Sequence, residues 1–122
     1  MSPRMKEVIE AHLTGEEAVN WISCQVQAAG EQRTYYILRF NRLPDVINPE
    51  LIRYSRTKKD KIGILAPCFS LEKIQRYAIF TQPEYANHWK IPTSLRVTDP
   101  LRRAIRKAKL TGNIFFGESY VA

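Results

Sequence analysis

Few side chains in this sequence have the types and spacing that catalysis requires. The histidines are His12 and His88, and the cysteines are Cys24 and Cys68, with no CxxC or CxxH spacing around them. This pattern argues against a zinc site, a redox pair and a disulfide framework, and we expect two reduced, buried thiols. Glycine-rich phosphate loops are also missing from the sequence. We therefore predict no enzyme, no metal and no cofactor, with a Cys68–His88 nucleophile pair as the open alternative.

Basic side chains are the first feature that points to a partner. The chain has 19 Lys and Arg against 12 Asp and Glu, a net charge of +7. The excess is regional, because residues 1–52 carry five basic and seven acidic side chains, whereas residues 53–122 carry fourteen and five. Such a charge suits either an acidic protein surface or the phosphates of a nucleic acid.

The densest basic pattern lies on a helix predicted from Asp99-Pro100 to Lys109. An apolar stripe recurs at helical spacing, and almost every remaining position is Lys or Arg. Two interpretations stay open: a solvated helix whose charges keep the protein soluble, or a patch that meets an acidic partner and raises the association rate. The stripe consists of Leu101, Ala104, Ile105 and Ala108, and the cations are Arg102, Arg103, Arg106, Lys107 and Lys109.

A second basic cluster surrounds Asp60 in the middle of the chain, at Arg53, Arg56, Lys58, Lys59 and Lys61. Like charges this dense favour an exposed turn. The candidate partner-binding residues therefore come from both clusters: Arg102, Arg103, Arg106, Lys107 and Lys109, with Arg53, Arg56, Lys58 and Lys59.

A nucleic-acid-binding domain is the alternative use of this basic surface, over residues 53–61 and 102–109. Tyr35, Tyr36 and Phe40 could then stack on bases, although an aromatic strand is more often part of a core. The sequence has no helix-turn-helix, zinc-finger or RNP-type pattern. Nucleic acid is thus the less favoured partner.

The elements that must position these residues are short. Ser2-Pro3 starts a helix that Leu13-Thr14-Gly15 is expected to end, with His12 capping its last turn. Strands are predicted at 18–28 and 34–40, joined as a hairpin by a turn at 30–33. Further strands are predicted at 62–69, 77–81 and 95–98, with a helical turn after Ser70.

The two ends of the chain repeat one pattern. Shifting the first helix by 97 positions places Ser2-Pro3 on Asp99-Pro100 and Leu13-Thr14-Gly15 on Leu110-Thr111-Gly112, and a strand is predicted next at 113–116. The predicted fold class is therefore α+β, a small, mainly antiparallel sheet with two similar helix-then-strand units at the chain ends.

One domain over residues 1–122 is expected from the length and from the 44% hydrophobic, 25% charged composition. No stretch approaches the roughly 20 apolar residues that a membrane-spanning helix needs, and the first residues lack the apolar core of a signal peptide. We expect a soluble, unprocessed, cytoplasmic protein with no membrane partner.

The order of several short motifs resembles the C-terminal domain of the immunity-protein-eleven family of bacterial polymorphic toxin systems. The motifs are the Ser-Pro-Arg-Met-Lys-Glu-Val helix, the strand from Val19-Asn20-Trp21, Tyr35-Tyr36-Ile37-Leu38, and the closing Leu110-Thr111-Gly112-Asn113-Ile114-Phe115-Phe116. Arg39 and Phe40 depart from the family's polar continuation, and the basic surface departs from its acidic or mixed one. Family members are also longer at the N-terminus, so the chain would be a shortened member or a domain of one.

The resemblance implies an immunity protein, an antidote that binds and blocks the toxin domain of a neighbouring secreted effector without chemistry of its own. The toxin would present an acidic surface to the basic residues. Binding to unrelated DNA or RNA with a steep salt dependence would instead favour the nucleic-acid-binding alternative. Loss of an activity on Cys68→Ala or His88→Ala would favour an enzyme.

Overall fold

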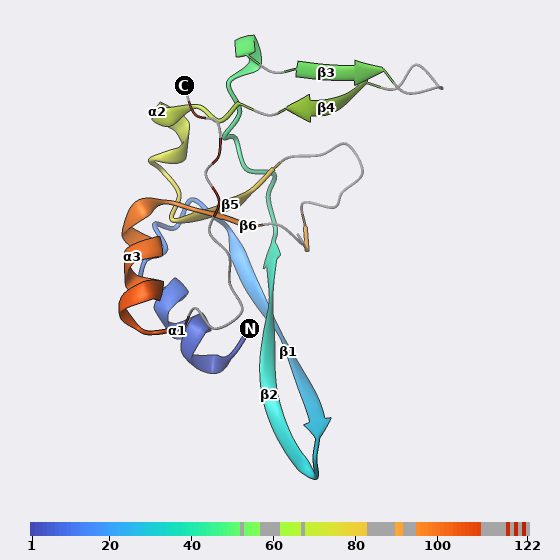
Figure 1. The fold of residues 1–122 in the computed structure, drawn as a ribbon, viewed down its shortest axis with the longest axis vertical. Coiled ribbons are helices and arrows are strands. Elements are labelled where there is room, and N and C mark those ends of the chain that lie inside the picture. The colour runs from blue at the N-terminus through green and yellow to red at the C-terminus, as the bar shows by residue number, and fades with distance from the viewer. Residues whose placement is uncertain are drawn as a thin grey trace.

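The computed structural model describes residues 1–51, 53–56, 62–66, 68–82, 90, 91, 95–110, 117, 119 and 121, and for 53–56 and 62–66 it describes the backbone path. The predicted α+β class is confirmed, and the described strands pair as three two-stranded antiparallel sheets, β1–β2, β3–β4 and β5–β6 (Figure 1). The elements are α1 (Pro3–Glu10), β1 (Val19–Ala28), β2 (Glu31–Phe40), a 3-10 turn (Pro49–Leu51), β3 (Arg53–Arg56), β4 (Ile62–Ala66), α2 (Leu71–Ile74), β5 (Ile79–Thr81), β6 (Leu95–Val97) and α3 (Asp99–Lys107).

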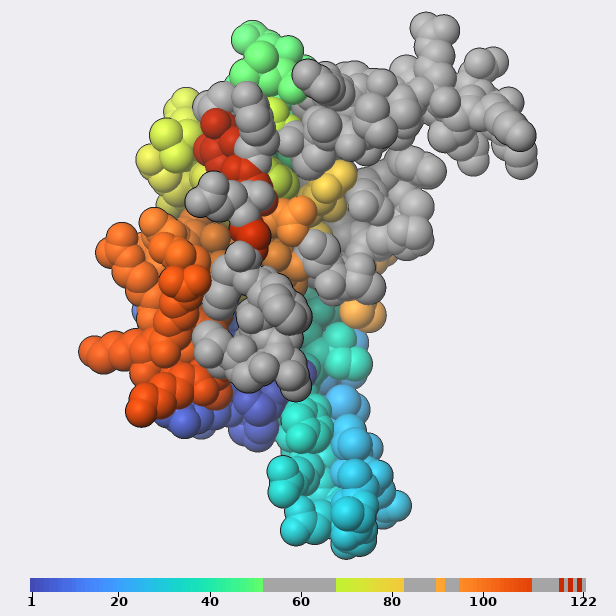
Figure 2. Space-filling view, viewed as in Figure 1, coloured from blue at the N-terminus to red at the C-terminus, as the bar shows by residue number. Residues whose placement is uncertain are grey.

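The β1–β2 hairpin is the longest element and projects from the rest of the molecule (Figures 1 and 2). Its register is regular from Val19 opposite Phe40 to Ala28 opposite Glu31. The predicted hairpin is confirmed, but the turn is shorter than expected. Ala29 and Gly30, with φ angles of 52° and 79°, form a two-residue turn of the kind whose twist matches the strands, so the chain re-enters the ladder at Glu31.

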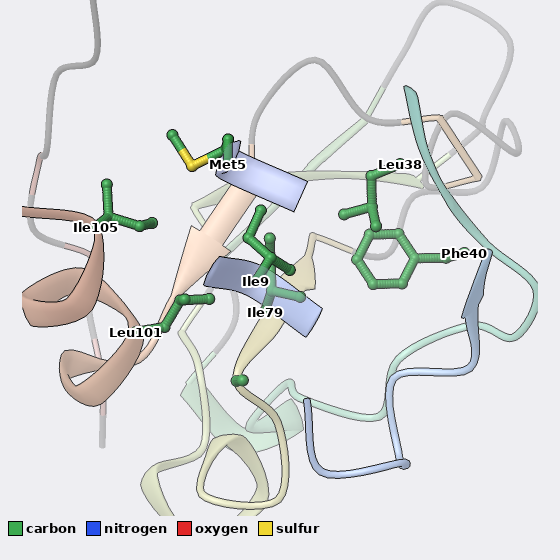
Figure 3. Packing of buried hydrophobic residues seen from close by; sticks show 8 residues of the cluster. Met5, Ile9, Leu38, Phe40, Ile79, Leu101 and Ile105 are labelled. Atoms are coloured by element: carbon green, nitrogen blue, oxygen red, sulfur yellow. The ribbon is translucent and has the colours of Figure 1, made fainter. Parts of the chain in front are cut away.

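The main core lies where the base of the hairpin meets α1, α3 and β5. Figure 3 shows side chains from all four elements converging there. The buried members are Met5, Ile9, Leu38, Phe40, Ala78, Ile79, Leu101 and Ile105. Because alternate residues of a strand share a face, Leu38 and Phe40 place one face of β2 against this core.

Helix α1 starts as predicted and ends earlier. The Ser2 hydroxyl accepts a hydrogen bond from Met5 N at 3.2 Å, and Pro3 follows in the first turn. The helix stops at Glu10, so the expected glycine stop is wrong here: Gly15, at φ 97°, turns the loop that follows instead.

Helix α3 ends at Lys107, and the left-handed residue after it is Lys109, at φ 57°. The expected second glycine stop, Gly112, and the predicted strand at 113–116 lie outside the described residues. What the structure shows of the repeat is therefore a proline in the first turn of each helix and the burial of both helices in one core. The predicted alignment of Ser2 with Asp99 is wrong, because Thr98 is the N-cap of α3 and makes no side-chain cap bond.

A second, smaller cluster joins the remaining elements. Val46, Phe69 and Phe80 are buried together, with the rings of Phe69 and Phe80 5.3 Å apart. Phe69 lies beyond the end of β4 and makes isolated bridges with Ile47 and Val121, so the strand predicted over 62–69 is shorter than expected. Ser70 caps α2 as predicted, through a bond from Lys73 N.

The helices that the structure describes are too short and too polar for any of them to pass through a bilayer.

Candidate functional site

Helix α3 is held by its apolar side and presents its cations outward. Leu101 and Ile105 are 0% and 4% exposed and lie in the main core. With 3.6 residues per turn, Arg103, Arg106 and Lys107 fall on the opposite side of the helix, and all three are exposed. The predicted stripe is confirmed. Figure 2 shows this segment, in orange, projecting its side chains from one flank of the molecule.

One carboxylate faces these cations along the helix. Asp99 accepts from Arg102 Nε at 3.0 Å and lies 3.8 Å from Arg103 Nη2. Lys107 and Lys109 make no ion pair with the part of the chain that the structure describes. Five cations against one carboxylate over residues 99–109 leave a net charge of +4. These charges interact favourably with the helix dipole, because Asp99 lies in the first turn and Arg106 and Lys107 lie in the last.

The five cations predicted on α3 are not equivalent. Arg103, Arg106 and Lys107 form its outer surface, which we call the α3 cationic face. Arg102 is half-buried beside Asp99, and Lys109 is exposed just after the helix end. The structure therefore places four of the five on α3 and the fifth just beyond its end, with three of them facing away from the core.

The second predicted cluster is not placed next to the α3 cationic face. Arg53 and Arg56 lie in β3, which Figure 1 shows at the end of the molecule opposite the hairpin tip and apart from α3. Lys58 and Lys59 lie outside the described residues.

The described residues do not form a catalytic arrangement of the kind that the enzyme alternative requires. Cys68 is 1% exposed, and its thiol is directed to the Phe69 carbonyl oxygen at 3.9 Å. His88 lies outside the described residues. His12 Nδ1 lies 2.9 Å from the Val8 carbonyl oxygen, which confirms the expected cap on α1. Within the described ranges, no three His, Cys, Asp or Glu side chains gather as metal ligands.

Cys24 differs from the expectation of a buried thiol. It is partly exposed on the β1–β2 hairpin, and both cysteines are free. The aromatic residues of β2 also differ in burial. Phe40 is fully buried in the core, as expected for most aromatic residues of a strand, whereas Tyr35 and Tyr36 are partly exposed.

Sequence reasoning missed Glu17, a carboxylate that is only 3% exposed. It accepts hydrogen bonds from the backbone N–H groups of Thr14, Gly15 and Ala78, the last at 2.7 Å. Every donor is fixed and belongs to the protein, so Glu17 joins the α1–β1 loop to β5 and is satisfied there. The Thr14-x-x-Glu17 spacing could have indicated this role, because a glutamate at this spacing accepts a hydrogen bond from the N–H three residues earlier.

Comparison with protein-family models, with curated proteins and with solved structures finds no match for this chain. The resemblance to the immunity-protein-eleven family therefore stays a prediction from the order of the sequence motifs.

Proposed function

We propose that the protein is an immunity protein, which binds an acidic surface of a toxin domain in the cytoplasm and blocks it without catalysing a reaction. The observation that supports this proposal most is the α3 cationic face: Arg103, Arg106 and Lys107 directed outward from a helix whose other side is locked into the core. The resemblance in motif order supplies the toxin as the class of partner.

Rigidity is what makes this surface suited to binding. The charges sit on a helix anchored by two fully or nearly buried side chains, so little backbone order has to be gained on association. Clustered cations of one sign attract an acidic partner over about 8–10 Å at physiological salt and raise the rate of encounter. Their effect on the stability of the fold is small because they are exposed.

The test begins with neutralisation. Cells that express the toxin domain of the neighbouring effector should survive when this protein is co-expressed. Growth arrest despite soluble co-expression would contradict the proposal.

The contribution of the α3 cationic face is tested by Arg103→Gln, Arg106→Gln and Lys107→Gln combined, which keeps good helix formers. We expect the association rate constant with the toxin domain to fall about tenfold at low salt, with a shallower salt dependence. Biolayer interferometry at several salt concentrations measures both quantities.

A matched control removes the same charge elsewhere. Arg4, Arg39 and Arg76 are exposed and lie on three separate parts of the chain, so their combined replacement by Gln gives the same net charge without touching α3. Equal slowing in both triple variants would show a net-charge effect rather than a local surface. Tight binding of the unmodified protein to a random-sequence DNA duplex or single-stranded RNA, with a steep salt slope, would favour the nucleic-acid-binding alternative.

A further inference from the structure

The outer face of the β1–β2 hairpin carries exposed apolar side chains in its middle, between Arg39 near the base and Arg33 near the tip. Ile22 lies directly opposite Ile37, and Cys24 opposite Tyr35. Ile22, Val26 and Ile37 are 37%, 42% and 39% exposed. The other face of the hairpin is occupied, since Lys6 of α1 stands 4.7 Å from the Tyr36 ring centroid and Leu38 enters the core.

Backbone hydrogen bonds show which edges of the hairpin are in use. Met1 N donates to Tyr36 O at 2.6 Å, and Tyr36 N donates to Met1 O at 2.8 Å. The backbone of Tyr36 therefore points away from β1, and that of its partner Ser23 points away from β2. Alternation along β1 then directs the backbone groups of Trp21, Ser23, Gln25 and Gln27 to its outer edge.

The two edges differ in occupancy. The β2 edge is bonded at Tyr36 by Met1 and at Phe40, whose N–H donates to Lys90 O at 2.9 Å. In the described part of the chain, no backbone group bonds to the outward positions of β1. A ten-residue edge strand of this kind is a template for another strand.

The β1 edge also lacks the usual protection against pairing. Its sequence, Val-Asn-Trp-Ile-Ser-Cys-Gln-Val-Gln-Ala, has no charge and no proline, and its register has no bulge. The charged pair near the hairpin tip compensates itself, because Arg33 binds Glu31 at 2.8 Å, which raises the pKa of Arg33. An acidic partner strand would find no cation on β1, so a neutral, apolar strand fits it better.

We propose that the occupant of this edge is β1 of a second copy of the chain, paired antiparallel about a two-fold axis at Cys24. This register is self-complementary: Ile22 of each copy meets Val26 of the other, and outward-pointing Ser23 meets outward-pointing Gln25. The result is a four-stranded sheet, β2–β1–β1–β2, whose apolar stripes join into one surface. In the outer half of the hairpin β1 lies on the side away from α3 (Figure 1). Two chains of net charge +7 would therefore meet through strands that themselves carry no charge.

The position of Cys24 allows the register of the proposed β1–β1 pairing to be tested by disulfide formation. Opposite each other at the two-fold axis, the two Cys24 residues form a non-hydrogen-bonded pair, whose Cα separation of about 4.5 Å is within disulfide range. Mild oxidation of both thiols by added diamide should therefore link the purified protein into a covalent dimer. Cys24→Ser should abolish the dimer band on a non-reducing gel, and Cys68→Ser should leave it. A link through Cys68 would overturn the proposal.

The edge itself is tested by a matched pair of prolines. Gln25 and Thr34 face each other in the hairpin, and each directs its N–H outward, toward opposite edges. By light scattering, wild type and Thr34→Pro should reach twice the 14.2 kDa chain mass at tens of micromolar, and Gln25→Pro should stay at the single-chain mass. A wild-type monomer up to about 1 mM, or a dimer that survives Gln25→Pro, would overturn the proposal.

A second variant keeps the test valid if Gln25→Pro loses its circular-dichroism signal. Val26→Lys leaves every backbone group intact and places a cation beside Ile22 of the other copy. It should weaken the dimer at least tenfold, and an unchanged dimer would count against the pairing.

Discussion

Helices α1 and α3 begin alike and differ in what they show to solvent. Each has a hydroxyl residue at its N-cap and a proline in its first turn, and each buries two residues of the same core, Met5 with Ile9 and Leu101 with Ile105. Outward, α1 balances Arg4 and Lys6 with Glu7 and Glu10, whereas α3 carries a strong cationic excess. Packing thus sets the inner side of both helices and leaves the outer side free to differ.

The helices also differ in how they are tied to β5. Both attachments end on the backbone of one residue, Ala78. The loop after α1 uses the Glu17 carboxylate, which accepts from Ala78 N, whereas the residue before α3, Thr98, donates its N–H to Ala78 O at 3.0 Å and its hydroxyl at 3.3 Å. The first attachment is charge-assisted and buried, and the second is neutral.

The largest expected effect tests whether α1 and α3 contribute equally to the stability of the main core. Ile9→Ala and Leu101→Ala should each lower the free energy of unfolding by about 3 kcal/mol, because both remove fully buried branched side chains. Urea denaturation followed by circular dichroism measures this. A loss below about 1 kcal/mol at either site would show that its helix is not part of the common core.

The two attachments to Ala78 should differ in how much they contribute to the free energy of unfolding. Glu17→Ala leaves buried donors unsatisfied and should cost about 2–3 kcal/mol of unfolding free energy, whereas Thr98→Val keeps the backbone bond and should cost about 1 kcal/mol. Glu16→Ala, at the exposed neighbouring position, is the control and should change stability by less than about 0.5 kcal/mol. Equal losses for Glu17 and Glu16 would contradict the anchoring role.

The smallest effect concerns the helix starts. Ser2→Ala removes the side-chain cap of α1 and should cost about 1 kcal/mol, whereas Ser2→Asn should restore most of it. Thr98 makes no such cap bond to α3, so the loss in Thr98→Val should come from its bond to Ala78 alone. Thermal unfolding resolves these differences, and a Ser2→Asn variant as unstable as Ser2→Ala would exclude capping as the cause.

The sequence was sufficient for features that depend on local chemistry. Spacing of Leu101 and Ile105 predicted the buried side of α3 and hence the direction of its cations, and the aromatic run predicted β2. Helix ends were less predictable, because Gly15 was available as a stop but the loop that Glu17 organises begins sooner. The turn at Ala29 was missed since a non-glycine residue occupies the left-handed region there.

Features that depend on distant contacts could not be predicted. Nothing near Glu17 in the sequence indicates that Ala78 N, 61 positions away, would donate a hydrogen bond to its buried carboxylate. The free edge of β1 likewise depends on Met1 and Lys90 reaching the opposite strand. The separation of β3 from α3 depends on the path of the whole chain, so two basic clusters that look alike in sequence do not form one surface.

A single residue, Ala78, thus connects segments from near the two ends of the polypeptide. Ala78 N–H binds the loop after α1, and Ala78 C=O binds the residue before α3. Displacement of Ala78 would therefore break both attachments, so the two segments should come apart together. The amide proton of Ala78 should accordingly be among the slowest to exchange with deuterated solvent, at a rate set by opening of the whole molecule rather than by local breathing.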